Sequence, residues 1–259
     1  MINQVIKGDC LEVMKTIDDK SIDMVLTSPP YDNLRTYKGY TFNFEGIAKE
    51  IYRVLKDGGV CVWVVGDATI KGSETGTSFK QALYFKEIGF NLYDTMIYSK
   101  PNAPLSHRRY EQDFEYMFVL CKGTPNTFNG IKDKINKYSG TSVSGSKRDV
   151  GTGIAKGLSG RKLGKVIQKY GLRGNIWRYS NSGGLSTKDS FAHQHPAIFP
   201  EKLAEDHILS WSNEGDIVLD PMCGSGTTLK MAKKNNRNYI GIEISQEYIE
   251  IINKRLENL

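Results

Sequence analysis

Residues 216–230 read DIVLDPMCGSGTTLK, and this stretch decides the fold. Asp216–Asp220 has the apolar run of a buried strand, the next six residues have the glycines of a tight turn, and Leu229–Lys234 has a helical pattern. Residues 239–244, YIGIEI, follow as a second apolar strand with an acid near its end. A strand, a glycine turn, a helix and another strand hold a nucleoside cofactor across the carboxyl ends of neighbouring strands. The stretch therefore predicts an α/β sheet with a nucleoside-binding edge.

The residues around this turn discriminate between nucleoside cofactors. A dinucleotide site has a third glycine where the helix begins, but this chain has Leu229 there. Asp220 would repel a pyrophosphate, whereas it can accept a hydrogen bond from an ammonium group. Glu243 can accept from both hydroxyls of a ribose, and Gly224 and Gly226 let the backbone approach a ligand closely. These features favour S-adenosylmethionine, which is a cation and carries no phosphate.

A third acid is expected at the same edge of the sheet. Asp9 ends the first predicted strand, in the sequence IKGDC. There it can accept from the amino group of adenine, or it can cap the helix predicted over residues 11–17. The sequence leaves both roles open.

The rest of the chain fits a doubly wound, mostly parallel sheet. Apolar runs alternate with helical patterns up to about residue 123 and again from about residue 197 onward, which predicts helices on both faces of the sheet. The other predicted elements are strands over 4–7, 22–26 and 60–65 and helices over 44–55 and 79–88. Strands over 91–98 and 114–121 are expected to pair as an antiparallel edge.

Residues 123–190 differ from the rest because Gly, Ser, Thr, Asn and Lys dominate and apolar periodicity is weak. Between Lys122 and Arg178, thirteen Lys or Arg stand against two acids, a local charge of +11 in a chain whose net charge is +6. Such an excess suits a polyanion-binding surface, although a solvated basic loop has the same composition. We therefore expect a single catalytic domain over 1–259 that carries a basic insert at about 123–190.

The strand Ile22–Leu26 leads into Ser28-Pro29-Pro30-Tyr31 at the ligand-binding edge. Two prolines fix the backbone and lack N–H donors, so their carbonyls can serve as rigid acceptors. The Ser28 hydroxyl and the Pro29 carbonyl can grip both hydrogens of an exocyclic amino group, which localises the nitrogen lone pair towards a methyl donor. Tyr31 can stack on a base drawn out of a duplex. A Pro-Pro turn with a packed tyrosine is the alternative without catalysis.

The order of these motifs resembles the permuted, β-class DNA amino-methyltransferases, among them the type II modification methylases with an S-P-P-Y motif. In that family a D/N/S-P-P-Y/F motif comes first, a target-recognition region follows, and the cofactor motif comes last. This chain has TSPPY at 27–31, the basic insert, and then DPMCGSGTT at 220–228 before YIGIEI. Residues 195–203 also resemble the family's segment that lines the methionine end of the cofactor.

The resemblance covers about residues 3–123 and 191–257. It implies a circularly permuted, Rossmann-like fold of S-adenosylmethionine-dependent methyltransferases, double-stranded DNA as substrate, a target base flipped out of the helix, and an insert that recognises the target. It implies a catalytic motif made of Ser28, Pro29, Pro30 and Tyr31. It also implies cofactor contacts from Asp9, Cys10, Phe199, Asp220, Gly224, Ser225, Gly226, Thr227 and Glu243.

The position before the two prolines bears on the target atom. Family members with Ser there are mostly cytosine-N4 enzymes and those with Asp mostly adenine-N6 enzymes, so Ser28 favours N4 of cytosine and leaves N6 of adenine as the alternative. Methylation at carbon 5 of cytosine is excluded, because its cysteine nucleophile follows a proline and this chain has no Pro-Cys dipeptide. An RNA methyltransferase and a non-enzymatic DNA-binding module are less favoured, since the basic insert fits an extended duplex and a binding module has no use for Glu243.

The cysteines, histidines and apolar runs bear on disulfides, metal sites and membrane helices. The four cysteines are scattered without a C-x-x-C pair, which supports neither a disulfide framework nor a zinc site and fits a cytoplasmic protein. No metal is expected, because no Cys or acid completes a site with His193 and His195. No apolar run reaches the roughly 18 residues of a membrane helix, so no membrane partner is expected. A restriction-modification or phage and host protection role is expected, while the sequence leaves open a cognate restriction endonuclease, a homodimer and the recognition site.

Overall fold

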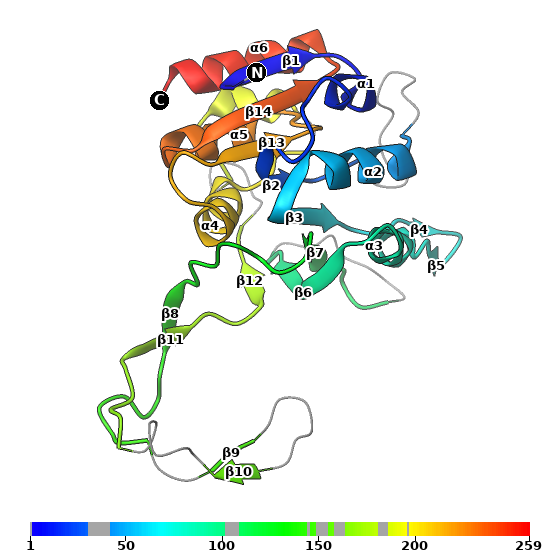
Figure 1. Ribbon diagram of the computed structural model, residues 1–259. Coiled ribbons are helices and arrows are strands. Elements are labelled where there is room, and N and C mark those ends of the chain that lie inside the picture. The colour runs from blue at the N-terminus through cyan, green and yellow to red at the C-terminus, as the bar shows by residue number, and fades with distance from the viewer. Residues whose placement is uncertain are drawn as a thin grey trace. The chain divides into compact units, whose positions relative to one another are not determined.

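The computed structural model describes residues 2–30, 42–101, 109–143, 146–148, 155–157, 164–180, 186–195 and 197–259. Within these ranges the largest sheet has eight strands in the order β1-β14-β13-β2-β3-β7-β6-β12 (Figure 1). Neighbours are parallel from β1 to β3, β7 is antiparallel to both of its neighbours, and β12 is parallel to β6. The predicted mostly parallel α/β architecture is confirmed.

Helices cover both faces of this sheet. Helices α1, α2 and α3 pack on one face and α4, α5 and α6 on the other (Figure 1). None of the helices in the described ranges is both long and apolar enough to span a bilayer. The strands are β1 (Gln4–Lys7), β2 (Ile22–Thr27), β3 (Leu55–Val65), β6 (Asn91–Ser99), β7 (Phe114–Cys121), β12 (Ile176–Arg178), β13 (Ile217–Asp220) and β14 (Asn238–Glu243). The helices are α1 (Cys10–Met14), α2 (Phe44–Val54), α3 (Thr77–Glu87), the 3-10 helix η1 (Ser190–Gln194), α4 (Glu201–Trp211), α5 (Thr227–Lys234) and α6 (Gln246–Glu257). A small hairpin of β4 (Thr69–Ile70) and β5 (Ser73–Glu74) follows β3.

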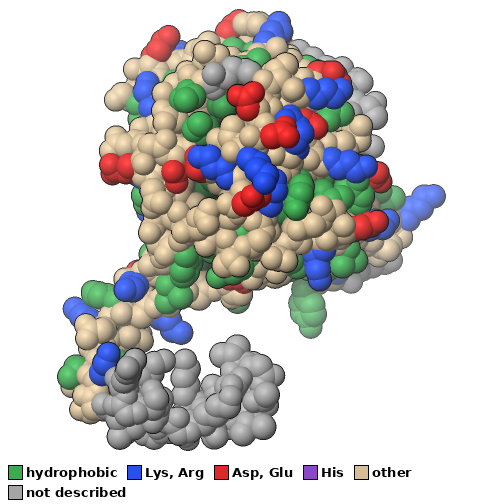
Figure 2. All heavy atoms as spheres, in the orientation of Figure 1, with side chains coloured by type: hydrophobic (Ala, Val, Ile, Leu, Met, Phe, Trp, Pro, Cys, Tyr) green, Lys and Arg blue, Asp and Glu red, His purple; other side chains and the backbone are tan. Residues whose placement is uncertain are grey.

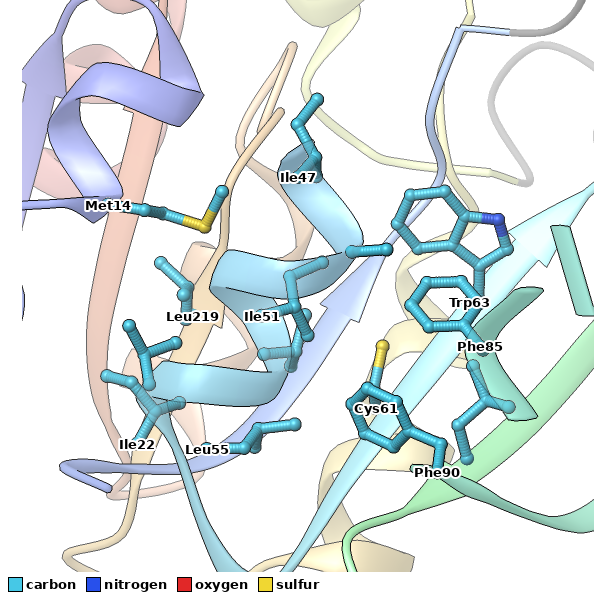
Figure 3. Close-up of a cluster of buried hydrophobic side chains, with 14 of the residues drawn as sticks. Met14, Ile22, Ile47, Ile51, Leu55, Cys61, Trp63, Phe85, Phe90 and Leu219 are labelled. Carbon is cyan, nitrogen blue, oxygen red and sulfur yellow. The ribbon is translucent and has the colours of Figure 1, made fainter. Parts of the chain in front are cut away.

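The core beneath α2 shows how the sequence builds one layer. Ile47, Ala48, Ile51 and Val54 recur on one face of this helix and are fully buried, and the Asn43 side chain caps the helix by accepting from the Gly46 amide at 3.1 Å. Figure 3 shows the α2 side chains between those of α1, β2 and β13 on one side and the aromatic rings of β3 and α3 on the other. This packing holds β2 beside β3, so the ends of both strands meet at one edge of the sheet.

The first and last parts of the chain share this sheet. β1 pairs with β14 over Gln4–Lys7, and β2 pairs with β13 through Met24 opposite Val218. α6 packs beside β1, so elements near the two ends of the chain lie side by side (Figure 1). This arrangement suits a permuted order of motifs, because the strands that carry them meet whichever is made first.

The chain divides into two compact units. Unit 1 comprises residues 1–129 and 175–259 and contains the main sheet, whereas unit 2 comprises residues 130–174 and lies within the predicted insert. In unit 2, β8 (Lys132–Ile135) pairs antiparallel with β11 (Tyr170–Leu172), and β9 (Ser146–Arg148) pairs antiparallel with β10 (Ala155–Gly157).

The predicted antiparallel pairing of residues 91–98 with 114–121 is confirmed as β6 and β7. The prediction that they form the edge of the sheet is wrong, because β12 adds outside β6. The Ile97 amide donates to the Asn175 carbonyl at 2.8 Å, where the chain re-enters unit 1. Trp177 on β12 is buried with its ring 4.6 Å from the His207 ring, so it belongs to the core between β12 and α4.

Candidate active site

A cavity of about 780 Å³ lies in unit 1, at the edge where β1, β2, β13 and β14 end. Parallel strands present their carboxyl ends together, which is where open α/β sheets bind ligands. Most of the predicted site residues line it: Asp9, Cys10, Ser28, Pro29, Pro30, Phe199, Asp220, Gly224, Ser225, Thr227 and Glu243. Tyr31 lies outside the described residues. Eleven residues from five separate parts of the sequence therefore surround one space.

The glycine turn after β13 is tied to the end of β14. The Gly224 amide donates to Glu243 Oε2 at 2.9 Å, and the Cys223 amide donates to the Ile242 carbonyl at 3.1 Å. Gly224 has a φ of +49°, and a Cβ on it would lie 2.8 Å from Nε2 of His195. The position therefore requires glycine both for its backbone conformation and for the close approach of the histidine ring.

Gly226 has a different place from the one predicted. It precedes α5 with a φ of +77°, and a Cβ there would lie 2.9 Å from the side chain of Ile252 on α6. Its missing side chain thus allows α5 and α6 to pack closely. Gly224 remains the glycine of this turn that lines the cavity.

Two acids face the cavity from neighbouring strands. Burial raises the pKa of Asp220 to about 6, although the Met222 amide donates to its carboxylate at 3.2 Å and the nearby Thr27 and Thr228 hydroxyls also lower the pKa. Burial also raises the pKa of Glu243, although the backbone amides of Ser245 and Gly224 donate to its carboxylate at 2.9 Å each. Each Glu243 oxygen accepts one of these bonds and keeps a lone pair for a ligand hydroxyl. The pair fits a cationic nucleoside, whose charge and hydroxyls would stabilise the ionised acids.

Asp9 has one of the two roles that the sequence left open, the cap of α1, and it also lines the cavity. Its Oδ1 caps α1 by accepting from the amides of Leu11 at 2.9 Å and Glu12 at 3.2 Å. Because both cap bonds go to Oδ1, Oδ2 keeps its capacity to accept from a ligand. Cys10 beside it is buried and lines the same wall.

The Ser28-Pro29-Pro30 segment leaves the end of β2 beside the glycine turn. β2 is parallel to β13, with Val25 opposite Leu219, so Ser28 follows β2 at the edge where Asp220 ends β13. Ser28 is half-buried, Pro29 is buried, and both line the cavity. The structure thus brings the proline motif and the cofactor motif to one cavity, although almost 190 residues separate them.

The far side of the cavity contains residues that the sequence did not single out. They lie where β6 ends and β7 begins: Tyr98, Lys100, Arg109, Tyr110, Gln112, Phe114 and Glu115. Lys100 and Glu115 form an ion pair at 2.8 Å, and the Tyr110 side chain is 98% exposed. The register of the β3–β7 pair would have identified them. Because β7 is antiparallel to β3, the first residues of β7 lie at the edge of the sheet where β3 ends.

His195 begins the segment 195–203 that the resemblance places at the cofactor, although the sequence predicts no role for its ring. It is buried, lines the cavity, and packs edge-on against Tyr248 with the ring centroids 4.4 Å apart. Its ring lies directly against Gly224, so the two residues form one part of the cavity wall. In the described ranges, no group of three or more His, Cys, Asp or Glu is placed to hold a metal ion.

Comparisons with known proteins identify the family of this chain. The model of the DNA methylase family matches residues 22–254. The orphan methyltransferase M.BamHII of Bacillus amyloliquefaciens is 58% identical over 250 residues, which cover 94% of this chain and 92% of that protein. The DNA adenine methyltransferase YhdJ of Escherichia coli (strain K12) is 31% identical, with 98% of this chain and 82% of that protein covered.

Solved structures share the fold. The PvuII DNA methyltransferase (cytosine-N4-specific) superposes with a TM-score of 0.69 at 22% identity, covering 98% of this chain and 86% of that one. M1.HpyAVI in complex with S-adenosylmethionine superposes with a TM-score of 0.63 at 24% identity, covering 98% of both chains. The fold is thus the Rossmann-like fold of S-adenosylmethionine-dependent methyltransferases, and the predicted cofactor, S-adenosylmethionine, is confirmed. With its family model matched over residues 22–254, this chain belongs to the DNA methylase family.

Proposed function

We propose that this DNA methylase is a β-class enzyme that transfers the methyl group of S-adenosylmethionine to N4 of a flipped-out cytosine at a specific site in duplex DNA. The observation that carries the proposal is the place of Ser28: a neutral hydroxyl directly before Pro29-Pro30, on the wall of the cavity that Asp220 and Glu243 also line. The S-P-P-Y form of this motif is the one that resembles the cytosine-N4 enzymes.

The chain's own groups have separate roles in this reaction. When bound, S-adenosylmethionine would supply an electrophilic methyl group: its S–C bond would break as the N–C bond forms, S-adenosylhomocysteine would leave, and the methylated nitrogen would lose one proton to solvent. Ser28 Oγ and the Pro29 carbonyl accept the two hydrogens of the exocyclic amino group, so that the nitrogen lone pair is turned out of conjugation with the ring. Tyr31, outside the described residues, is proposed to stack on the flipped base. Asp220 and Glu243 hold the cofactor through its ammonium group and its ribose hydroxyls.

Unit 2 has the surface expected of a DNA-recognition region. Its sequence contains eleven Lys or Arg and two acids. Exposed apolar and aromatic side chains lie among them, at Ile135, Tyr138, Val166, Tyr170 and Leu172. Figure 2 shows basic side chains at the surface of this unit, whereas on the visible face of unit 1 Lys and Arg lie among Asp and Glu. Basic groups that bind phosphates, interleaved with exposed rings, support target recognition by residues 130–174.

The identity of the methylated base is tested directly by analysis of the nucleosides in the product DNA. DNA from cells that express the protein, and DNA methylated in vitro, are digested to nucleosides and separated by mass spectrometry. The expected product is N4-methylcytosine, strongly reduced in cells that express Ser28→Ala. N6-methyladenine as the sole product would overturn the proposed base and leave the methyl transfer intact. Single-molecule sequencing of the same DNA gives the sequence context of the modified base.

Adenine N6 is the second candidate, and one observation favours it. YhdJ, described as a DNA adenine methyltransferase, is 31% identical to this chain, whereas the cytosine-N4-specific PvuII enzyme is 22% identical. We prefer cytosine because Ser28 lines the cavity directly before Pro29-Pro30, where the S-P-P-Y form favours N4, while overall identity is distributed over the whole fold. M.BamHII is described as an orphan methyltransferase, which favours a role for this chain without a cognate restriction endonuclease.

A further inference from the structure

The side chain of Arg255 on α6 is fully buried behind the glycine turn. A guanidinium has five N–H donors in a rigid fork and remains charged, so its burial requires several acceptors at fixed positions. Arg255 finds these acceptors on two sides, in the turn after β13 and in the segment that leads into α4.

Towards the turn, Arg255 Nη1 donates to the Ser225 carbonyl at 2.7 Å, to Ser225 Oγ at 3.3 Å and to Thr227 Oγ1 at 3.0 Å. Both residues line the cavity, and Ser225 follows Gly224 directly. Arg255 therefore fixes the turn from behind, on the side away from the cavity.

On its other side, Arg255 Nε donates to Asp189 Oδ2 at 2.9 Å and Nη2 donates to Glu201 Oε1 at 2.7 Å. Lys230 on α5 donates to the same two carboxylates, at 2.7 and 2.8 Å. Burial alone would raise the pKa of Asp189 and of Glu201, but hydrogen bonds from these two cations hold both pKa values below the usual range. The four side chains form a charge-balanced network, with two cations and two anions.

Such a network contributes little net stability, because the cost of taking charges out of water offsets much of their attraction. Its clearer effect is geometric. Asp189 and Glu201 flank the segment that carries His195 and Phe199, and Arg255 ties that segment to the glycine turn. Two walls of the cavity that are distant in sequence are thereby held at one spacing.

We propose that Arg255 is a positioning residue for S-adenosylmethionine: it holds the turn at Gly224–Thr227 against the segment that carries His195 and Phe199. This inference rests on the proposed assignment of the turn to the cofactor. Lys230 binds the same two carboxylates but has no bond to Ser225 or Thr227 among the described contacts, so the chain offers a matched control.

Two charge-balanced double variants separate positioning from stability. Arg255→Met with Glu201→Gln removes one cation, one anion and the bonds to the turn. Lys230→Met with Glu201→Gln removes the same charges but keeps Arg255 on Ser225, Thr227 and Asp189. Affinity for S-adenosylmethionine is measured by calorimetry, the thermal midpoint is measured without ligand, and kcat and KM are measured for cofactor and DNA separately.

We expect the double variant with Arg255→Met to lose about tenfold or more in affinity for the cofactor. The double variant with Lys230→Met should keep an affinity within about threefold of that of the unmodified protein. In the Arg255 pair KM for the cofactor should rise while kcat at saturating cofactor changes little. Equal affinity losses in the two pairs, in step with their thermal midpoints, would overturn the positioning role, as would unchanged affinity in the Arg255 pair.

Arg255→Lys provides a second variant that keeps the charge in place. A lysine can still pair with the carboxylates but cannot bridge to the turn through a planar fork, so KM for the cofactor should rise several-fold at a nearly unchanged thermal midpoint. An unchanged KM would contradict the proposal. Failure of the unmodified protein to bind S-adenosylmethionine would instead refute the proposed function, which distinguishes the two ideas.

Discussion

The Glu243 carboxylate accepts the amide hydrogen of Gly224 at 2.9 Å, so the acid that ends β14 is bound to the turn that follows β13. The two residues thus hold each other in place at the carboxyl ends of β13 and β14. Glu243 keeps lone pairs for a ribose, and Gly224 keeps its amide oriented because the carboxylate is fixed. Any change that displaces one of them should displace the other.

Gly224→Ala should lower affinity for S-adenosylmethionine by about tenfold or more, because the added Cβ would lie 2.8 Å from His195 Nε2 and displace the turn. Affinity is measured by calorimetry. The alanine also occupies a left-handed conformation, at a cost of roughly 1–2 kcal/mol.

Gly215→Ala is the matched control for this backbone cost. Gly215 has a φ of +84° and no heavy atom within 4 Å of the added Cβ, so the variant should lose stability without losing cofactor affinity. Similar affinity losses in both variants would show that strain, and not the contact with His195, is responsible.

Cofactor affinity should depend on pH through Asp220. Burial raises its pKa to about 6, so the carboxylate is almost fully ionised at pH 8 and about one-tenth ionised at pH 5. Since an ammonium group binds the ionised form, affinity should fall by about tenfold between pH 8 and pH 5. Calorimetry at the two pH values measures this, and Asp220→Asn should show a weaker affinity with a smaller dependence. The same slope in both proteins would assign the titration to another group.

Ser28→Ala should lower kcat by on the order of 100-fold while cofactor affinity stays the same, because one acceptor for the amino hydrogens is lost in the transition state. The measurement is single-turnover methyl transfer at saturating DNA and cofactor. Ser73→Ala on β5, outside the cavity lining, is the control and should behave as the unmodified protein. A full rate in Ser28→Ala would remove this residue from the catalytic motif.

Tyr110→Ala should weaken the use of DNA, with cofactor affinity kept. Its ring is 98% exposed at the cavity, while Arg109 beside it is anchored to Thr69 Oγ1 at 3.0 Å and to the Gly72 carbonyl at 2.8 Å. An exposed aromatic ring at the cavity can stack on a base, which is worth roughly 1–3 kcal/mol.

The corresponding measurement is kcat/KM on duplexes with a paired or a mismatched target. We expect a loss of about tenfold on the paired target and a smaller loss on the mismatch, since that base is already unpaired. Leu83→Ala, an exposed residue of α3 away from the cavity, should change neither value. Equal losses on both duplexes would assign Tyr110 to backbone contact and not to base extrusion.

Motifs at strand ends were predictable from the sequence because parallel strands impose a common edge. Asp220, Glu243, Asp9 and Ser28 each follow or end an apolar run, and the fold brings all four to one cavity. Tyr98 and Lys100, on the far side of the cavity, were not predictable as lining residues, because apolar patterning predicts that their strand pairs with the next one but not in which register.

Arg255 illustrates a second limit. No motif in the sequence singles out Arg255, yet it is fully buried. Its burial depends on acceptors contributed by three distant segments, which only the assembled fold defines. Gly226 shows the opposite situation. The sequence predicts that its backbone approaches the ligand, whereas in the fold its missing side chain leaves room for Ile252 on α6, and this contact depends on how the helices pack.

The pairing of β2 with β13 has a consequence for biosynthesis. Asp23 on β2 accepts from the amide of Ile217, 194 positions later, at 2.9 Å. A growing chain therefore exposes the proline motif long before the strand that completes the sheet leaves the ribosome. A product that is truncated before β13 (Ile217–Asp220) has no cofactor turn, so methyl transfer is confined to chains that extend beyond this strand. Contacts this far apart in sequence also predict slow final folding, which bound cofactor should assist.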